Sequence, residues 1–109
     1  MSAPPLLLYD TLSDTKRPLE PLEPGHVRFY LCGPTVYDLS HVGHARSAIC
    51  ADIVVRFLRE QGLRVTFARN VTDVDDKIIK RSQQEGITPD EVAAKYLAAY
   101  HEDLDALGC

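Results

Sequence analysis

The sequence has few cysteines and no long apolar run. Its three cysteines, Cys32, Cys50 and Cys109, are an odd number without close spacing. This argues against the disulfide framework of small secreted proteins and favours a reducing compartment, so we expect the cytoplasm. No stretch reaches the roughly 18 apolar residues of a membrane-spanning helix, and no positively charged start precedes the short leucine run at residues 6–8. We therefore expect neither a signal peptide nor a membrane partner.

An excess of positive charge is also absent. Twelve lysines and arginines stand against sixteen aspartates and glutamates, a net charge of −4, which argues against a stand-alone DNA-binding protein. The charge is uneven, because residues 41–81 carry eight basic and five acidic side chains whereas residues 82–109 carry one and six. The central segment is basic enough to face an anion such as phosphate, but solvated charges along a helix would give the same pattern.

Proline divides the chain into two parts. Five of the seven prolines lie in the first 26 residues, which excludes a regular helix there. We interpret residues 1–26 as a lead-in, in which residues 6–12 form a short edge strand and the Pro-rich stretch forms a returning loop. Residues 27–109 then form one domain, because 109 residues leave no room for a second core of comparable size.

The middle of the chain has the pattern of an α/β fold. Residues 27–31 and 63–68 are rich in β-branched and aromatic side chains, which predicts two strands. Between them, residues 43–61 carry apolar residues at helical spacing. Strand, helix and strand predict parallel neighbouring strands joined by a right-handed crossover. The predicted apolar face of the helix comprises Ala45, Ala48, Ile49, Ile53, Phe57 and Leu58, and we expect Cys50 to be packed in the core on that side.

Two further helices are predicted after the second strand. Thr72 to Asp75 has the pattern of a capping box, which would make Thr72 the N-cap of a helix that ends near Gly86. Thr88 followed by Pro89 predicts the start of a second helix, and Gly108 predicts the end of that helix. The predicted apolar side of this last helix comprises Val92, Tyr96, Tyr100, Leu104 and Leu107.

The densest polar cluster lies between the first strand and the long helix, in residues 32–44. In open α/β sheets ligands bind at this place, beyond the carboxyl ends of the strands. His41 and His44 are three residues apart at the predicted helix start, so both can point donors at an anion held by the positive end of the helix. Gly43 lies between them and leaves the backbone bare for a base or ribose. A phosphate-bearing nucleotide is the ligand that this pattern favours.

Residue types alone leave two alternatives open. Cys32, His41 and His44 are the ligand types that zinc prefers, but a fourth ligand is lacking. The histidines could also be surface or cap residues beside a partly buried Cys32.

Three motifs, in order, resemble the cysteinyl-tRNA synthetase family of class I aminoacyl-tRNA synthetases. They are Tyr30-Leu31-Cys32-Gly33-Pro34-Thr35-Val36-Tyr37-Asp38, His41-Val42-Gly43-His44-Ala45-Arg46 and Asn70-Val71-Thr72-Asp73-Val74-Asp75-Asp76-Lys77-Ile78. The second departs from the usual signature only by valine for isoleucine, and Pro34 stands where isoleucine is commoner. The resemblance implies that residues 27–109 are the first half of a Rossmann-like, nucleotide-binding catalytic domain.

The same resemblance implies an activity and a set of residues. The family joins cysteine to ATP as cysteinyl-adenylate and passes the cysteinyl group to tRNA(Cys). His41 and His44 would stabilise charge in the adenylation transition state, and His41, Gly43 and His44 would bind ATP. Cys32, Gly33 and Thr72 would line the amino-acid site, with Cys32 as one ligand of a zinc ion that binds the substrate thiolate.

The family is several times longer than this chain, so other parts are expected elsewhere. The remaining zinc ligands, a second phosphate-binding loop and the tRNA-reading helices have no counterpart in residues 1–109. We therefore expect a partial synthetase, monomeric and inactive in tRNA charging by itself. Two alternatives remain: the cysteine ligase of mycothiol biosynthesis, which shares the adenylation chemistry, and a non-catalytic nucleotide- or protein-binding module. Val36 and the run Asp76-Lys77-Ile78-Ile79 favour the synthetase, since proline is expected near both positions in that ligase.

Overall fold

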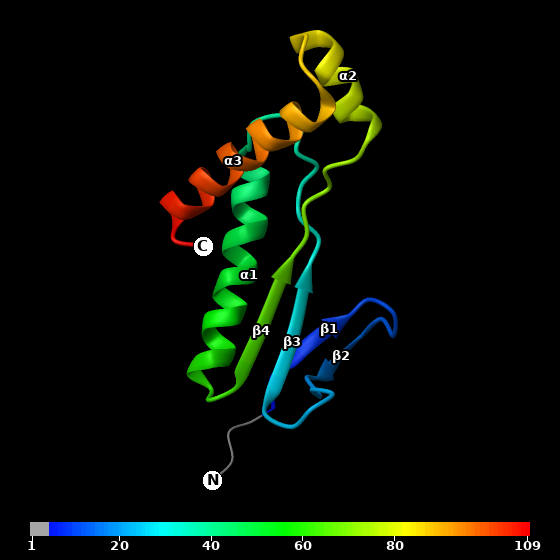
Figure 1. Cartoon of the computed structure of the whole chain (residues 1–109). Helices are drawn as coiled ribbons and strands as arrows, with labels where there is room; N and C mark the ends of the chain where they lie inside the picture. Colours follow the sequence, from blue (N-terminus) through cyan, green and yellow to red (C-terminus); the bar gives the residue numbers. More distant parts are fainter. Residues whose placement is uncertain (1–4) are drawn as a thin grey trace.

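The computed structural model describes residues 5–109 and contains four strands and three helices within them. In chain order they are β1 Leu7–Asp10, β2 Thr15–Pro18, β3 His26–Leu31, α1 Val42–Glu60, β4 Arg64–Arg69, α2 Asp76–Glu85 and α3 Pro89–Leu107. Figure 1 shows α1 running alongside the β3–β4 pair, with α3 crossing its upper end. No helix in this part of the chain is long and apolar enough to cross a membrane.

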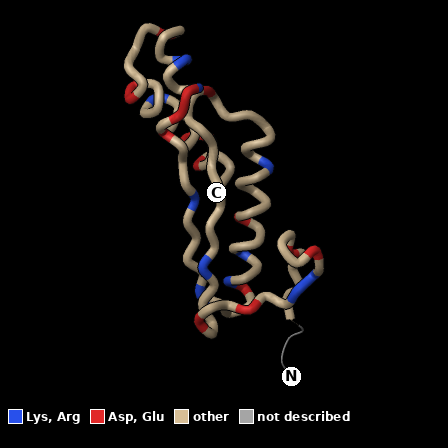
Figure 2. Tube along the Cα trace, turned by 90° about the vertical axis from the view of Figure 1, so that its right-hand side faces the viewer, with Lys and Arg blue, Asp and Glu red and all other residues tan. Residues whose placement is uncertain are grey.

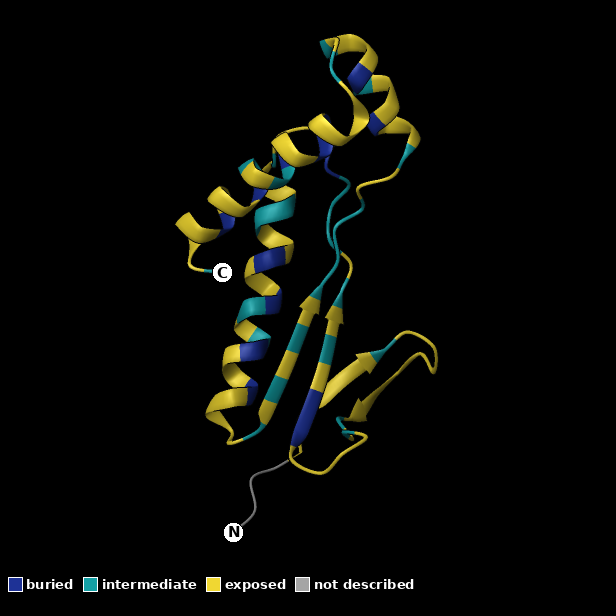
Figure 3. Cartoon of the chain, viewed as in Figure 1, coloured by how far each residue is buried: buried dark blue, intermediate teal, exposed yellow. Residues whose placement is uncertain are grey.

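The predicted strand–helix–strand unit is confirmed. β3 and β4 pair in parallel, with Val27 opposite Val65 and Leu31 opposite Arg69. β4 alternates between exposed and half-buried residues throughout, and β3 alternates from Val27 onward after a buried His26, which gives the bands in Figure 3. The rings of Phe29 and Phe67 lie 5.1 Å apart on one face. The sheet is therefore covered on one side, where helix α1 lies, and open on the other.

The buried face of α1 differs from the predicted one. Its buried residues are Ala48, Ala51, Val55 and Leu58, whereas Ile49, Ile53 and Phe57 are 38%, 60% and 46% exposed. The prediction of Cys50 as a core residue is also wrong, because its side chain is exposed. The helix carries apolar residues on two sides, and only the position of the sheet decides which side is buried.

Helix α2 begins later than predicted. Asp75 is its N-cap, with a carboxylate that accepts a hydrogen bond from the Lys77 N–H at 2.8 Å. Thr72 is therefore not a cap; it forms an isolated parallel bridge with Thr35, which extends the β3–β4 pairing. Asp76 is the one acidic residue in the first turn of α2. Asp75 is an equally good cap residue closer to the helix, and it takes the place of Thr72.

Helix α3 follows its sequence signals. Thr88 and Glu91 form a reciprocal capping box, Pro89 begins the helix, and Gly108 ends it with φ 74°. Its inner side packs into two apolar clusters, one with α2 and the loop after β3, the other with α1. The first cluster contains Val36, Ile78, Val92, Ala93 and Tyr96, and the second contains Ala48, Tyr100 and Leu104. Leu107 was expected on this side but is 46% exposed.

The N-terminal lead-in contains a hairpin that the sequence pattern missed. β1 pairs antiparallel with β2, in a register that runs from Leu7 opposite Pro18 to Asp10 opposite Thr15. The predicted edge strand therefore exists, and its partner is the segment Thr15–Pro18, which ends at the first proline of the Pro-rich stretch. The pair forms its own two-stranded sheet, and Figures 1 and 2 both show it standing apart from α1 and the β3–β4 pair.

Candidate functional site

The candidate site begins where β3 and β4 leave their regular pairing. Beyond the strands, the Asn70 N–H donates to the Leu31 carbonyl at 3.2 Å, and the Thr72 N–H donates to the Pro34 carbonyl at 3.0 Å. The Val36 N–H returns a bond to the Thr72 carbonyl at 3.1 Å. These bonds hold the loop after β3 against the loop after β4. The predicted site residues Cys32, Gly33 and Thr72 are thereby held on neighbouring, hydrogen-bonded segments of backbone.

Gly33 permits the close approach of these two loops. Its N–H donates to the Asn70 side-chain oxygen at 2.5 Å, and a Cβ on Gly33 would lie 1.8 Å from the Asn70 carbonyl oxygen. No side chain can be accommodated there without moving the backbone. Asn70 is thus a site residue that sequence reasoning did not single out. The available signal was a polar residue directly after a predicted strand, but its partner 37 residues away could not be read from the sequence.

The two histidines cap helix α1 reciprocally. The Gly43 N–H donates to Nδ1 of His41 at 3.0 Å, and the His41 N–H donates to Nδ1 of His44 at 3.1 Å. Both rings therefore replace the Ser/Thr and Glu side chains of an ordinary capping box. Their centroids lie 4.0 Å apart with planes inclined by 32°. The expected placement of both imidazoles at the helix start is confirmed.

These hydrogen bonds assign the tautomers of both rings. A nitrogen that accepts a hydrogen bond carries no proton, so in the neutral imidazole the proton lies on Nε2. Neither Nε2 bonds to another residue of the described chain 5–109, so both N–H donors remain free. Burial lowers the pKa of His44 below its ordinary range, and the neighbouring His41 lowers it further. His44 is therefore a neutral donor at physiological pH.

Gly43 has a local reason to be glycine. A Cβ there would lie 2.8 Å from Cε1 and 3.0 Å from Nδ1 of His41. The missing side chain makes room for the His41 ring in its capping position. Close approach of a base or ribose to this backbone, which the sequence pattern suggested, stays a prediction.

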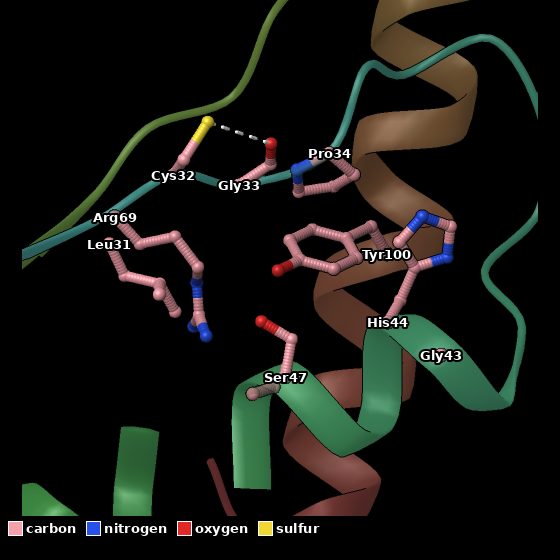
Figure 4. A pocket seen from close by; sticks show the side chains of 10 residues that line it. Leu31, Cys32, Gly33, Pro34, Gly43, His44, Ser47, Arg69 and Tyr100 are labelled. Carbon is pink, nitrogen blue, oxygen red and sulfur yellow. Dashed lines mark hydrogen bonds between the residues drawn. The ribbon is translucent and has the colours of Figure 1, made fainter. Parts of the chain in front are cut away.

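A cavity of about 220 Å³ lies between the end of β3 and the start of α1. Figure 4 shows Cys32, Gly33 and Pro34 along one wall, His44 and Ser47 of α1 on another, and Arg69 and Tyr100 reaching in from β4 and α3. The complete lining is Leu31, Cys32, Gly33, Pro34, Gly43, His44, Ser47, Ala48, Arg69 and Tyr100. The structure thus brings four predicted site residues to one cavity, whereas His41 and Thr72 lie outside its lining.

The described residues do not form a metal site by themselves. No group of three or more His, Cys, Asp or Glu side chains within residues 5–109 is arranged to hold an ion. Cys32 is an exposed free thiol, not the partly buried one of the structural alternative, and its Sγ lies 3.8 Å from the Gly33 carbonyl oxygen. A zinc site made of Cys32, His41 and His44 is also disfavoured, since Nδ1 of both histidines accepts a capping bond and Nε2, the other possible ligand atom, therefore carries the proton.

Comparison with known proteins bears on this arrangement. The family described as "tRNA synthetases class I (C) catalytic domain" matches residues 18–109. That range includes both histidines, the Gly33–Asn70 contact and the whole cavity. The chain belongs to this family. The match confirms the resemblance noted in the sequence, and the fold is the mixed α/β arrangement with a short parallel sheet.

Curated relatives carry one name. The chain is 60% identical over 100 residues to a cysteine–tRNA ligase of Nitratidesulfovibrio vulgaris, strain Miyazaki F, covering 92% of this chain and 21% of that protein. It is 56% identical over 103 residues to a cysteine–tRNA ligase of Syntrophobacter fumaroxidans, covering 94% of this chain and 21% of that protein. A third relative, a cysteine–tRNA ligase of Anaeromyxobacter sp. strain K, is 57% identical over 101 residues, covering 93% of this chain and 21% of that protein. The chain thus spans about a fifth of the length of these relatives.

Proposed function

We propose that this chain supplies the first part of the Rossmann-like catalytic domain of a cysteine–tRNA ligase. In this role residues 27–109 bind ATP and cysteine, and residues 1–26 lead into the domain. The observation that carries the proposal is the reciprocal histidine cap at the carboxyl end of a parallel strand pair. It presents two N–H donors and the positive end of a 19-residue helix at the place where α/β folds bind nucleotides.

The histidines would act on the phosphates of ATP. In adenylation the cysteine carboxylate forms a bond to the α-phosphorus, the bond to the β-phosphate oxygen breaks, and pyrophosphate leaves. Nε2–H of His41 and His44 would donate to the phosphate oxygens on which charge develops, which lowers the barrier if these bonds strengthen in the transition state. Because both rings are already fixed by their Nδ1 atoms, little reorganisation is needed when ATP binds.

Cys32, Gly33 and Thr72 would hold the amino acid. Gly33 lines the cavity and fixes the loop that carries Cys32, and Thr72 lies in the facing segment through its bond to Pro34. Cys32 would supply one ligand to zinc in a protein whose other ligands lie outside this chain. The single thiol here does not fit a zinc site alone, so selection of the substrate thiol needs ligands that residues 5–109 do not supply.

The remaining partners follow from the family. tRNA(Cys) would receive the cysteinyl group, and we expect a monomer in the cytoplasm. The named relatives favour this function over the cysteine ligase of mycothiol biosynthesis. A module that binds only protein would have no need of two free donors at a nucleotide-binding position, and the named relatives favour the enzyme over a non-catalytic nucleotide-binding module.

A chimera tests the proposal. The chain replaces the matching segment of the N. vulgaris relative, and cysteine-dependent exchange of pyrophosphate into ATP is measured. We expect the chimera to be active, and His41→Asn or His44→Asn to lower kcat by about 10²–10³, the usual loss for one transition-state donor. The exposed His101 provides the matched control, and His101→Asn should leave the rate unchanged.

The isolated chain completes this experiment. We expect no tRNA charging by it. Robust charging by the isolated chain, an inactive chimera that is nevertheless folded, or full activity of the His44→Asn chimera would each contradict the proposal.

A further inference from the structure

Arg69 is the last residue of β4 and reaches into the cavity (Figure 4). Its guanidinium carbon lies 5.6 Å from the centre of the Phe67 ring and 5.7 Å from the centre of the Tyr100 ring. Two aromatic faces thus hold a half-buried cation in one position. The stacking orients the guanidinium before any ligand arrives.

No carboxylate in residues 5–109 lies within ion-pair distance of Arg69, and its guanidinium makes no hydrogen bond to another residue of this range. Five other arginines of the described residues each lie within 4.0 Å of an aspartate or glutamate oxygen: Arg17, Arg28, Arg56, Arg64 and Arg81. Arg46 and Arg59 lack such a partner too, but both are exposed, whereas Arg69 is half-buried. A guanidinium is always charged and carries only donors. A half-buried one without an anionic partner is therefore poised to receive an anion from outside these residues.

Two hydroxyl groups share the cavity with Arg69. Figure 4 shows the Ser47 and Tyr100 hydroxyls pointing toward the space in front of the guanidinium. Tyr100 is only 5% exposed, and burial raises its pKa although Arg69 opposes the shift. The phenol therefore keeps its proton and can donate. Neither hydroxyl forms a hydrogen bond to another described side chain, so all three groups are available to one ligand.

We propose that Arg69, Tyr100 and Ser47 bind an oxyanion of the adenylation substrates. The inference rests on the proposed function, because the same cavity contains Cys32, Gly33 and His44. Three converging donors require an acceptor with negative charge, which is either a carboxylate or a phosphate. At about 220 Å³ the cavity lies below the usual range for a whole small-molecule ligand. It therefore receives one charged end group, the carboxylate of the amino acid or a phosphate of the nucleotide.

Titration of the intact 109-residue chain tests this site by NMR. Sodium pyrophosphate and L-cysteine are added separately, and the Arg69 Nε–H and Tyr100 ring signals are followed. Cysteamine, which is cysteine without its carboxylate, is the control for the second arm. We expect saturable shifts with at least one ligand: a response to pyrophosphate identifies a phosphate site, and a response to cysteine but not to cysteamine identifies a carboxylate site.

Variants separate binding from packing. Arg69→Gln should lower the affinity for the responding ligand by about tenfold, which is the effect of losing a hydrogen bond to a charged group. Arg59 lies on the exposed end of α1, and the control variant Arg59→Gln should leave the affinity unchanged. If Arg69→Gln unfolds, Tyr100→Phe keeps the ring and removes only the hydroxyl, and it should also weaken binding.

Absence of any saturable shift at Arg69, or equal binding by the Arg69 and Tyr100 variants and the parent chain, overturns the inference. A separate titration of the same chain with ATP follows the His41 and His44 ring signals. If these shift while Arg69 fails to respond, the oxyanion site is wrong and the proposed function stands. If the histidines also fail to respond, the proposed function is contradicted as well.

Discussion

A histidine can accept a helix-capping hydrogen bond only while the accepting nitrogen is unprotonated. At His41 and His44 this requirement joins two roles, because the Nδ1 atoms hold the cap and the Nε2 protons remain for a ligand. An ordinary Ser or Glu cap would close the helix equally well but would present no further donor. In the proposed function, the choice of histidine is explained by the donor that each ring leaves free as well as by helix stability.

The His44 cap should depend on pH. Because the folded state lowers the pKa of His44, the unfolded chain takes up a proton more readily, at its ordinary value of about 6.5. The contribution of this group to stability is fully present above that pH and is lost as pH falls through the lower folded value. NMR titration of the ring nitrogens should show Nε2–H at pH 7.5 and a pKa below the ordinary one.

Thermal unfolding of the parent chain and of His44→Gln at pH 7.5 and pH 5.5 provides the control. The difference in melting temperature between the two proteins should shrink at the lower pH. A His44 that titrates above its ordinary value, or that carries its proton on Nδ1, would contradict the assigned cap.

Gly33→Ala should disrupt the contact between the two loops. The added methyl group would lie 1.8 Å from the Asn70 carbonyl oxygen, so the backbone must shift, at a cost of about 1–3 kcal/mol in unfolding free energy. Chemical denaturation gives this value, and hydrogen exchange of the Asn70 and Thr72 amides locates the damage. Unchanged stability together with unchanged protection of both amides would show that the loops are not in close contact.

At the scale of elements, α1 shows how far a helical pattern can predict packing. Its length and both ends were predicted within about two residues, because the histidine cap and Gly62 mark them locally. Its buried face was not, since Ile49, Ile53 and Phe57 form an apolar row as regular as the one that is buried. The prediction of Thr72 as the N-cap of α2 was wrong for a related reason, because Asp75 is a competing cap residue three positions later.

Substitutions on the two apolar rows of α1 should differ in effect. Leu58 is 2% exposed and Ile53 is 60% exposed. Leu58→Ala should cost about 2–5 kcal/mol, as large-to-small changes in a core do, whereas Ile53→Ala should change stability by about 0.5 kcal/mol or less, as surface changes do. Urea denaturation of both variants gives the comparison. Equal losses would place the sheet against the other row.

The whole molecule is extended for its length. The Cα radius of gyration is 17.5 Å and the principal extents are 62 × 31 × 24 Å, whereas a compact domain of this size has a radius of about 13 Å. The parallel sheet has only two strands and one covered face, although parallel sheets are normally covered on both. An open sheet face and an exposed apolar row on α1 are what one part of a larger α/β domain would present.

The β1–β2 hairpin should open independently of the rest. Isolated two-stranded sheets are marginal in water, and the base of the hairpin leaves a cavity of about 510 Å³ against the end of α1. Amides of β1 and β2 should therefore exchange with solvent about a hundredfold faster than those in the middle of β3 and β4. Native-state hydrogen exchange measures both sets at once. Equal protection would mean that the hairpin belongs to the same cooperative unit.

Local sequence patterns were sufficient to predict the order of the central elements and the histidine pair at a helix start, because strand composition, helical spacing, caps and stop signals act over a few neighbouring residues. Tertiary packing was needed to show which side of α1 is buried, why Gly33 must be glycine, and that Asn70, Arg69 and Tyr100 join the site. These outcomes depend on contacts between segments that lie far apart in the chain. A local pattern contains no record of which distant backbone or ring will occupy the neighbouring space.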